Sequence, residues 1–318
     1  MKKFVAILLC SFSLLSAGEI ETQTLQFGNY PVPWFTGPLL APSGAVVPLG
    51  HCKLQPYLNT FVRVGEFDSH WHSSSVPNFY DLNLRIQIKF GIFPRAEFQI
   101  TPHIRFQETR SQKSFGLGDT SFNLNLQILA PQTVHGGPYL KLALRAFAPT
   151  GKYQRLNPDK LRTDKRGHGS WYPGTSLILT KIWHISGLHY IELRSEYTYH
   201  FGTPVCVHGE NAYGGDATTY GTVYPGNYYF FETALQYNLT QNWALACDFR
   251  YEHHNRDRFS GTTTLSTTHH STEDVSLAPA IEYNFRRTLG LIGGVWFNVA
   301  GRNTHQFVNG MLSFVAYF

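Results

Sequence analysis

Residues 81–92 read DLNLRIQIKFGI, and in this stretch apolar and polar side chains alternate. Every second residue from Leu82 to Ile92 is apolar, and the residues between them from Asp81 to Lys89 are polar. A period of two places one kind of side chain on each face of a β-strand. A barrel that spans a membrane needs this pattern, because its outer wall contacts lipid and its inner wall contacts water or polar side chains.

The same alternation recurs along the rest of the chain and predicts about twelve strands. Each is roughly 10 to 14 residues long, which is enough for a tilted strand to cross a bilayer. They are expected at 52–64, 80–92, 96–107, 119–130, 138–148, 171–183, 188–200, 227–239, 243–254, 274–285, 290–300 and 306–318. The predicted fold is all-β: a closed antiparallel transmembrane β-barrel of about 12 strands, within a range of 12 to 14.

The connections between the predicted strands alternate between short and long. The short ones are 93–95, 131–137, 184–187, 240–242 and 286–289; the long ones are 65–79, 108–118, 149–170, 201–226 and 255–273, with a briefer one at 301–305. Outer-membrane barrels have short periplasmic turns and longer external loops. With an even number of strands, both termini are expected on the periplasmic side.

Three parts of the chain are predicted. Residues 1–18 resemble a secretory signal peptide, with a charged start, an apolar run and small residues before the cleavage point. Residues 19–50 are rich in proline and glycine, which excludes a central strand or a helix. Trp34 and Phe35 indicate that this part packs against something, either as a periplasmic plug inside the barrel or along its rim. Residues 51–318 form the barrel, in the outer membrane of a Gram-negative bacterium.

Aromatic residues make up 15% of the chain and cluster toward the ends of the predicted strands. Such rings favour the headgroup level and predict girdles at both membrane interfaces. The candidates are Phe93, Trp171, Tyr172, Trp183, Tyr228, Tyr229, Trp243, Tyr251, Tyr283, Phe285 and Tyr317. The chain stops at Phe318, and a terminal aromatic residue is what the barrel-assembly machinery is expected to read. Outer-membrane lipid and lipopolysaccharide are the expected surroundings.

Charged residues on the polar faces of the strands are expected to line the lumen, since a lysine or arginine facing lipid near the midplane costs about 2–4 kcal/mol. The candidates are Arg85, Lys89, Glu97, Arg105, Lys141, Arg145, Arg194, Glu232, Asp248, Arg250 and Glu282. Both signs are present, so these groups either pair across strands and stiffen the wall or form a polar constriction. A barrel of this size predicts a slim or partly plugged pore.

Composition and motifs argue against several other functions. The net charge of +5 is too weak and too dispersed for nucleic-acid binding. No G-x-S-x-G motif is present, and Asp248, Glu252 and His253 match a protease site only weakly. The pairs His253–His254 and His269–His270 lack the spacing of a zinc module. The sequence therefore predicts no enzyme, no metal site and no cofactor.

Four short motifs resemble a known family. Gly116-Leu-Gly-Asp119, Pro149-Thr-Gly151, Pro173-Gly-Thr175 and Pro225-Gly226 fall at strand boundaries, in an order similar to that of the outer-membrane β-barrel transporter family related to the phenol meta-cleavage-pathway (MetA-type) proteins. The resemblance covers roughly residues 50 to 318 and implies passage of small apolar or aromatic compounds. The expected function is passive transport of a small solute. The alternatives are an adhesion protein that uses the barrel as a scaffold and, less favoured, a hydrolase at the outer rim.

Overall fold

The computed structural model describes residues 34–131, 137–262, 265 and 270–318. The predicted signal peptide and the first part of the proline-rich stretch lie outside these residues. Within them, nearly all regular structure is β. The strands are β1 (Cys52–Phe67), β2 (Ser73–Phe93), β3 (Ala96–Thr101), β4 (His103–Thr109), β5 (Gln112–Leu117), β6 (Thr120–Leu129), β7 (Tyr139–Ala148), β8 (Tyr172–Ser186), β9 (His189–His200), β10 (Val205–His208), β11 (Tyr220–Tyr224), β12 (Tyr228–Asn238), β13 (Trp243–His254), β14 (Arg258–Gly261), β15 (Thr272–Arg286), β16 (Leu289–Arg302) and β17 (Thr304–Tyr317).

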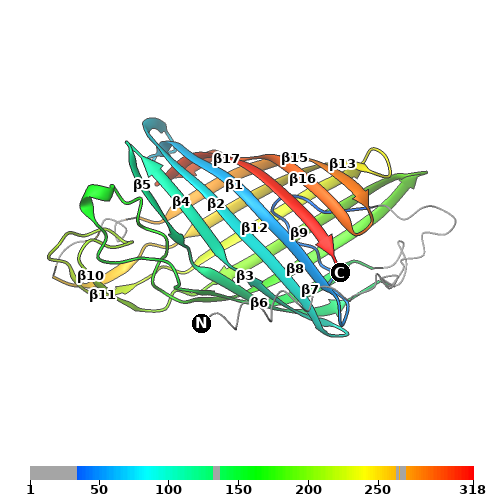
Figure 1. Cartoon of the computed structure of the whole chain (residues 1–318), viewed down its shortest axis with the longest axis horizontal. Helices are drawn as coiled ribbons and strands as arrows, with labels where there is room; N and C mark the ends of the chain where they lie inside the picture. Colours follow the sequence, from blue (N-terminus) through cyan, green and yellow to red (C-terminus); the bar gives the residue numbers. More distant parts are fainter. Residues whose placement is uncertain (1–33, 132–136, 263–264, 266–269) are drawn as a thin grey trace, which may run out of the picture.

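These strands form a closed antiparallel barrel, as predicted (Figure 1). The ladder runs from β1 through β17 and back around to β2, which pairs with β1 and closes the ring. Pro102 separates β3 from β4, and Gly118 and Asp119 separate β5 from β6, so each pair is one interrupted strand of the wall. Counted this way, the barrel has twelve strands, and each predicted strand is confirmed.

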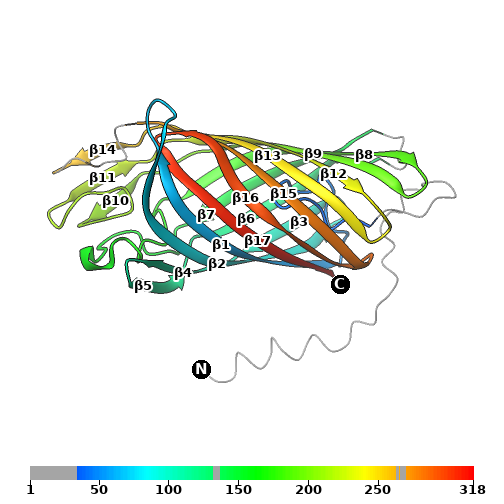
Figure 2. The ribbon, with the colours of Figure 1, turned by 90° about the horizontal axis from the view of Figure 1, so that it is seen from above.

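The two ends of the barrel differ (Figures 1 and 2). The C-terminus and the short connections lie at one end, here called the short-turn end. The other end, the loop end, carries a small sheet of β10, β11 and β14 and a single turn of 3-10 helix, η1 (Pro158–Lys160).

The prediction of two long loops is wrong. Residues 65–79 and 108–118 are mostly strand, because β1, β2, β4 and β5 extend past the membrane as hairpins. Beyond the lipid a strand needs no apolar face, so the alternation that marks a strand is lost there. The sequence carries no turn signal between β4 and β5. Arg110 and Ser111 have φ of 44° and 67°, a conformation that Gly or Asn usually adopts.

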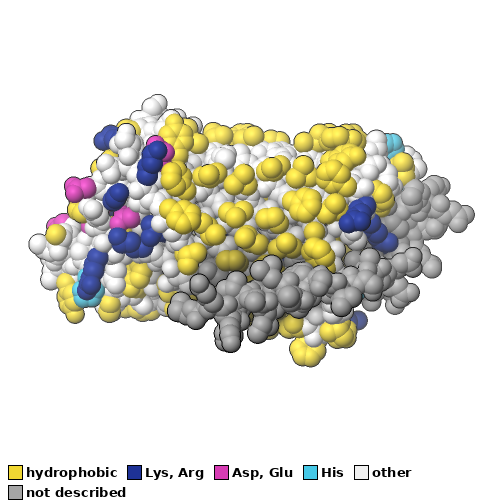
Figure 3. All heavy atoms as spheres, viewed as in Figure 1, with side chains coloured by type: hydrophobic (Ala, Val, Ile, Leu, Met, Phe, Trp, Pro, Cys, Tyr) yellow, Lys and Arg dark blue, Asp and Glu magenta, His cyan; other side chains and the backbone are white. Residues whose placement is uncertain are grey.

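The distribution of side chains is the reverse of that in a water-soluble protein. Large apolar residues are exposed on the outer wall, among them Leu58, Leu82, Leu144, Leu177, Leu235, Leu245, Ile281, Val295 and Leu312. The buried positions are largely polar, among them Asn59, Asn83, Gln99, Asn123, Ser176, Thr198, Gln236, Ser276 and Asn309. Figure 3 shows the apolar side chains covering the middle of the wall, with charged ones toward the ends. An outer wall of this kind suits contact with lipid rather than water.

No helix within the described residues is long and apolar enough to cross a membrane.

The lipid contact of the outer wall can be measured at Leu235, which is 57% exposed on β12. We expect Leu235→Lys to lower the free energy of unfolding in lipid vesicles by about 2–4 kcal/mol, because the ammonium enters hydrocarbon near the midplane. Leu239→Lys, next to the short turn, is the matched control, with a cost of about 0–1 kcal/mol near the interface. Equal costs in guanidinium titrations of the two variants would contradict a lipid-facing wall.

Candidate functional site: the barrel lumen

The lumen contains the stretch that precedes β1. This inner segment, residues 34–50, runs inside the ring of strands in the half nearer the short-turn end (Figures 1 and 2). Leu39, Ala41 and Val47 are buried there. Leu39 packs against Ala278 and Ile292 on the inner wall.

Two carboxylates of the wall bind the backbone of the inner segment near its middle. Asp248 on β13 accepts hydrogen bonds from the N–H groups of Leu39, Leu40 and Ala41 at 3.1, 3.2 and 2.9 Å. Glu282 on β15 accepts hydrogen bonds from the N–H groups of Thr36 and, at 3.0 Å, Gly37. Neither carboxylate has a salt-bridge partner among the described residues. The backbone of the segment therefore takes the place of a counter-ion.

A second group of contacts holds the part of the inner segment next to β1. Glu97 accepts a hydrogen bond from the N–H of Val47 at 2.6 Å. Lys141, which pairs with Glu97 at 3.4 Å, donates to the carbonyl oxygen of Ala45 at 3.3 Å. Gln127 accepts from the N–H of Val46 at 2.9 Å and donates to a segment carbonyl, that of Gly44, at 2.8 Å. Both the donors and the acceptors of the segment backbone are thus satisfied by the wall.

The segment meets β2 at a glycine. Leu49 forms a parallel bridge with Gly91, and the N–H of Gly50 donates to the Gly91 carbonyl at 3.1 Å. A Cβ atom on Gly91 would lie 1.8 Å from the carbonyl oxygen of Pro48. Only glycine allows the two backbones to approach this closely.

The eleven predicted lumen residues all lie on the inner side of the barrel and fall into two groups. Five contact the inner segment: Glu97, Lys141, Arg194, Asp248 and Glu282. Six line a cavity between the segment and the loop end: Arg85, Lys89, Arg105, Arg145, Glu232 and Arg250. Of the predicted plug residues, Trp34 and Phe35 are both half-buried, and the carbonyl oxygen of Trp34 accepts hydrogen bonds from Asn238 and Asn284 at 3.4 and 3.1 Å.

The cavity has a volume of about 500 Å³, and Leu39, Leu40 and Pro42 of the inner segment form part of its lining. Most charges around it are paired. Arg145 pairs with Glu196 at 2.5 Å, and Arg250 pairs with Glu232 at 2.9 Å and with Glu252. Further round the wall, Lys89 pairs with Glu97 at 3.8 Å and Arg105 with Asp81.

A row of rings borders the cavity near the loop end. The ring centroids of His200 and Tyr228 are 4.6 Å apart, and those of Tyr228 and His254 are 5.3 Å apart, with interplanar angles of 18° and 5°. His200 and His254 are the register partners of Tyr228 on β9 and β13. Phe147 of β7 extends the row, 5.3 Å from His200. Alternation on β12 and β13 puts Tyr228 and His254 on the inner face, but nothing in the sequence brings the three strands into this register.

Three predicted girdle residues are therefore wrong. Tyr172 and Tyr228 line the cavity, and Tyr317 packs against the buried Lys53, whose Nζ lies 5.2 Å from the ring centroid. Adjacent positions on a strand face opposite sides, so only one residue of Trp171–Tyr172 and one of Tyr228–Tyr229 can face lipid. The prediction failed at these pairs because it counted neighbouring aromatic residues together without assigning each to a face of its strand.

The loop end is covered by folded connections. Val205, Val207, Ala212, Tyr213, Val223 and Leu265 form an apolar cluster beneath the small sheet of β10, β11 and β14. The connection between β7 and β8 packs against it, and Arg162 donates to the carbonyl oxygens of Asn211 and Ala212 at 3.2 and 3.0 Å. In the same connection, the N–H groups of Gly151 and His168 donate to Asp119 at 2.9 and 2.8 Å.

One lysine of this connection has a perturbed pKa. Burial, with the positive charges of Arg162 and Arg105, lowers the pKa of Lys165 to about 7. The carboxylates of Asp257 and Asp119 oppose this shift. Lys165 therefore changes charge near neutral pH at the mouth of the lumen.

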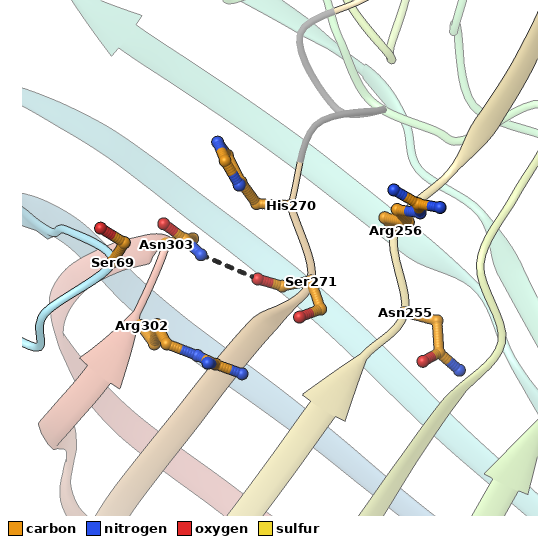
Figure 4. A pocket seen from close by; sticks show the side chains of 7 residues that line it. All are labelled: Ser69, Asn255, Arg256, His270, Ser271, Arg302 and Asn303. Carbon is orange, nitrogen blue, oxygen red and sulfur yellow. Dashed lines mark hydrogen bonds between the residues drawn. The ribbon is translucent and has the colours of Figure 1, made fainter.

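A second, open cavity of about 640 Å³ lies among the turns of the loop end (Figure 4). Arg256, His270 and Arg302 border it, and the side chain of Asn303 donates to the carbonyl oxygen of Ser271 at 3.1 Å.

The histidine pairs do not form a site in the described residues. His254 lies in the ring row, whereas His253 stacks on Tyr229 and pairs with Glu273 at 3.4 Å. His269 lies outside the described part of the chain, and no group of three metal-ligating side chains occurs within that part.

Comparison with known proteins places this geometry in a family. The profile of the family described as "Putative MetA-pathway of phenol degradation" matches residues 43–314. The chain belongs to this family. The match begins within the inner segment and runs nearly to the end of β17, so it includes the whole barrel. A search of the curated proteins found no match.

A comparison with solved structures bears on the fold. The COG4313 outer membrane channel from Pseudomonas putida F1 matches with a TM-score of 0.65 at 15% identity, covering 86% of this chain and 97% of that chain. The translocator domain of autotransporter NalP from Neisseria meningitidis gives 0.41 at 11%, covering 84% and 88%, and the β domain of the Bordetella autotransporter BrkA gives 0.41 at 12%, covering 83% and 99%. The first match shows a shared fold. With the apolar outer wall and the family, it places the protein in the outer membrane.

Proposed function

We propose that the protein is a passive channel that carries a small solute across the outer membrane. The observation that carries this proposal is the polar lumen, in which a cavity of about 500 Å³ lies between the loop end and the inner segment. A pocket of this volume accommodates one small organic molecule. The family description names phenol degradation, which makes aromatic or other apolar compounds the first candidates.

We further propose that the short-turn end faces the periplasm. Short turns and the C-terminus gather at this end, and outer-membrane barrels keep their short turns in the periplasm. The inner segment then acts as a plug on the periplasmic side, and the folded connections face the medium.

Single-channel recording in planar bilayers tests the channel directly. We expect discrete but small conductance steps in KCl from the purified protein, because the inner segment occupies part of the lumen. Protein shown to be folded by its heat-modifiable migration in gels, yet without conductance, would overturn the proposal.

The charge of Lys165 predicts a pH dependence of ion selectivity. Its pKa of about 7 means that the ammonium is mostly charged at pH 6 and mostly neutral at pH 8. We expect the preference for chloride over potassium to rise as the pH falls from 8 to 6, measured as a reversal potential across a KCl gradient. Lys165→Met should remove this change. An equal change in the variant would assign it to other groups.

A second candidate function, surface adhesion, is favoured by one observation: the loop end has its own apolar cluster and a three-stranded sheet. An ordered outer surface is suited to binding a partner. Replacing residues 203–224 with a short linker separates the two functions, since transport should survive and adhesion should not.

A further inference from the structure

The two sides of the cavity differ in chemistry and face each other. In the ring of twelve strands, β12 lies six strands from β2, and β13 lies six strands from β4. Each pair is therefore on opposite walls of the lumen. The ring row of His200, Tyr228 and His254 belongs to the wall of β9, β12 and β13, whereas Arg85 and His103 belong to the wall of β2 and β4.

The wall of β2 and β4 has spare positive charge. Arg85 donates to the amide oxygen of Asn59 at 3.3 Å and has no carboxylate partner among the described residues. Arg166, in the connection between β7 and β8, also lines the cavity and has no carboxylate partner among the described residues. His103, the register partner of Arg85, has its Nε2 atom buried without a hydrogen-bond partner within the described chain. A half-buried cation that lacks a carboxylate partner favours an anionic guest, which would balance its charge.

The opposite wall offers aromatic contact. Rings stacked side by side along the wall present their edges to the lumen, and these edges carry partial positive charge. The π-face of an aromatic guest packs against such edges. The Trp296 indole N–H, which also borders the cavity, has no hydrogen-bond partner among the described residues and remains available as a donor.

We infer that the cavity selects aromatic carboxylates. The ring of the guest packs against His200, Tyr228 and His254, and its carboxylate points across the lumen toward Arg85. This inference rests on the proposed channel function for its physiological meaning, and it adds a negative charge to the class of solute. A neutral phenol or a neutral sugar would leave the spare charge of the basic wall unsatisfied.

Three probes separate the contributions of ring and charge: benzoate carries both, benzyl alcohol carries the ring alone, and acetate carries the carboxylate alone. Binding to the detergent-solubilised protein is measured by isothermal titration, and block of the KCl current is measured in planar bilayers. We expect benzoate to bind about tenfold more tightly than either other probe, a difference of about 1.4 kcal/mol. Arg85→Gln should reduce benzoate to the affinity of benzyl alcohol, and Tyr228→Leu should reduce it to that of acetate.

The matched control is Arg95→Gln, in the exposed turn between β2 and β3, which should leave benzoate binding unchanged. Equal binding of benzoate and benzyl alcohol by the unaltered protein would overturn the inference while a KCl conductance still supported the channel. Benzoate binding without any conductance would overturn the proposed channel function and still support the binding site. Unchanged benzoate affinity in both folded cavity variants would also overturn the inference.

Discussion

Deletion of residues 34–47 is expected to raise the single-channel conductance several-fold and to shift the selectivity toward cations. The conductance rises because this segment fills the lumen on the short-turn side. The selectivity shifts because Asp248 and Glu282 lose the backbone N–H groups that balance them and face water instead. The measurement is conductance and reversal potential in planar bilayers.

Glu97 is expected to contribute less to this shift, since Lys89 and Lys141 remain beside it at 3.8 and 3.4 Å. The control for folding is heat-modifiable gel migration of the shortened protein. A folded variant with the conductance of the intact chain would show that the segment does not limit the flow of ions.

Releasing the segment without removing it is the second large effect. We expect the double substitution Asp248→Asn and Glu282→Gln to weaken five hydrogen bonds from backbone N–H groups to charged acceptors, at a total cost of about 5 kcal/mol. That cost shifts the equilibrium toward the released segment by roughly several thousandfold. The recording should then show frequent openings to the conductance level of the deletion variant.

The matched control removes two other lumen carboxylates, through Glu232→Gln and Glu252→Gln. Both pair with Arg250. The control should alter selectivity without producing the large openings. If both double variants opened equally often, loss of negative charge rather than release of the segment would explain the openings.

The strands could be predicted closely because lipid imposes the same demand on every one of them. Leu235 must face hydrocarbon and Gln236 the lumen, and both are visible in a two-residue period. The hairpin extensions were missed because they leave the membrane, where that demand ends. The turn at Arg110 and Ser111 was missed because neither residue type indicates a positive φ.

The site was only half visible in sequence. Alternation identified Asp248 and Glu282 as lumen carboxylates, but their partners are N–H groups, which every residue except proline possesses and which no pattern reveals. The sequence predicts a lipid-facing girdle position for Tyr228, whereas its ring faces the lumen. The neighbouring Tyr229 is also aromatic, so the residue types alone do not distinguish the two faces. Tyr228 is aligned with His200 and His254 by the register of β9, β12 and β13. That register depends on the loops that connect these strands, and the sequence does not reveal how the loops set it.

The hydrogen bonds between the wall and the inner segment limit which substitutions the segment can accept. Its prolines, Pro38, Pro42 and Pro48, all fall between the positions whose N–H groups the wall binds. The hydrogen bonds reach the main chain, so substitutions at the less buried positions, such as Leu40 and Ala45, should be tolerated. The buried Leu39, Ala41 and Val47 are constrained by packing as well. A proline moved by a single position should not be tolerated, because it would remove a bound N–H group. The sequence of this stretch is therefore constrained by where its backbone lacks an N–H donor and by the few side chains that the wall buries.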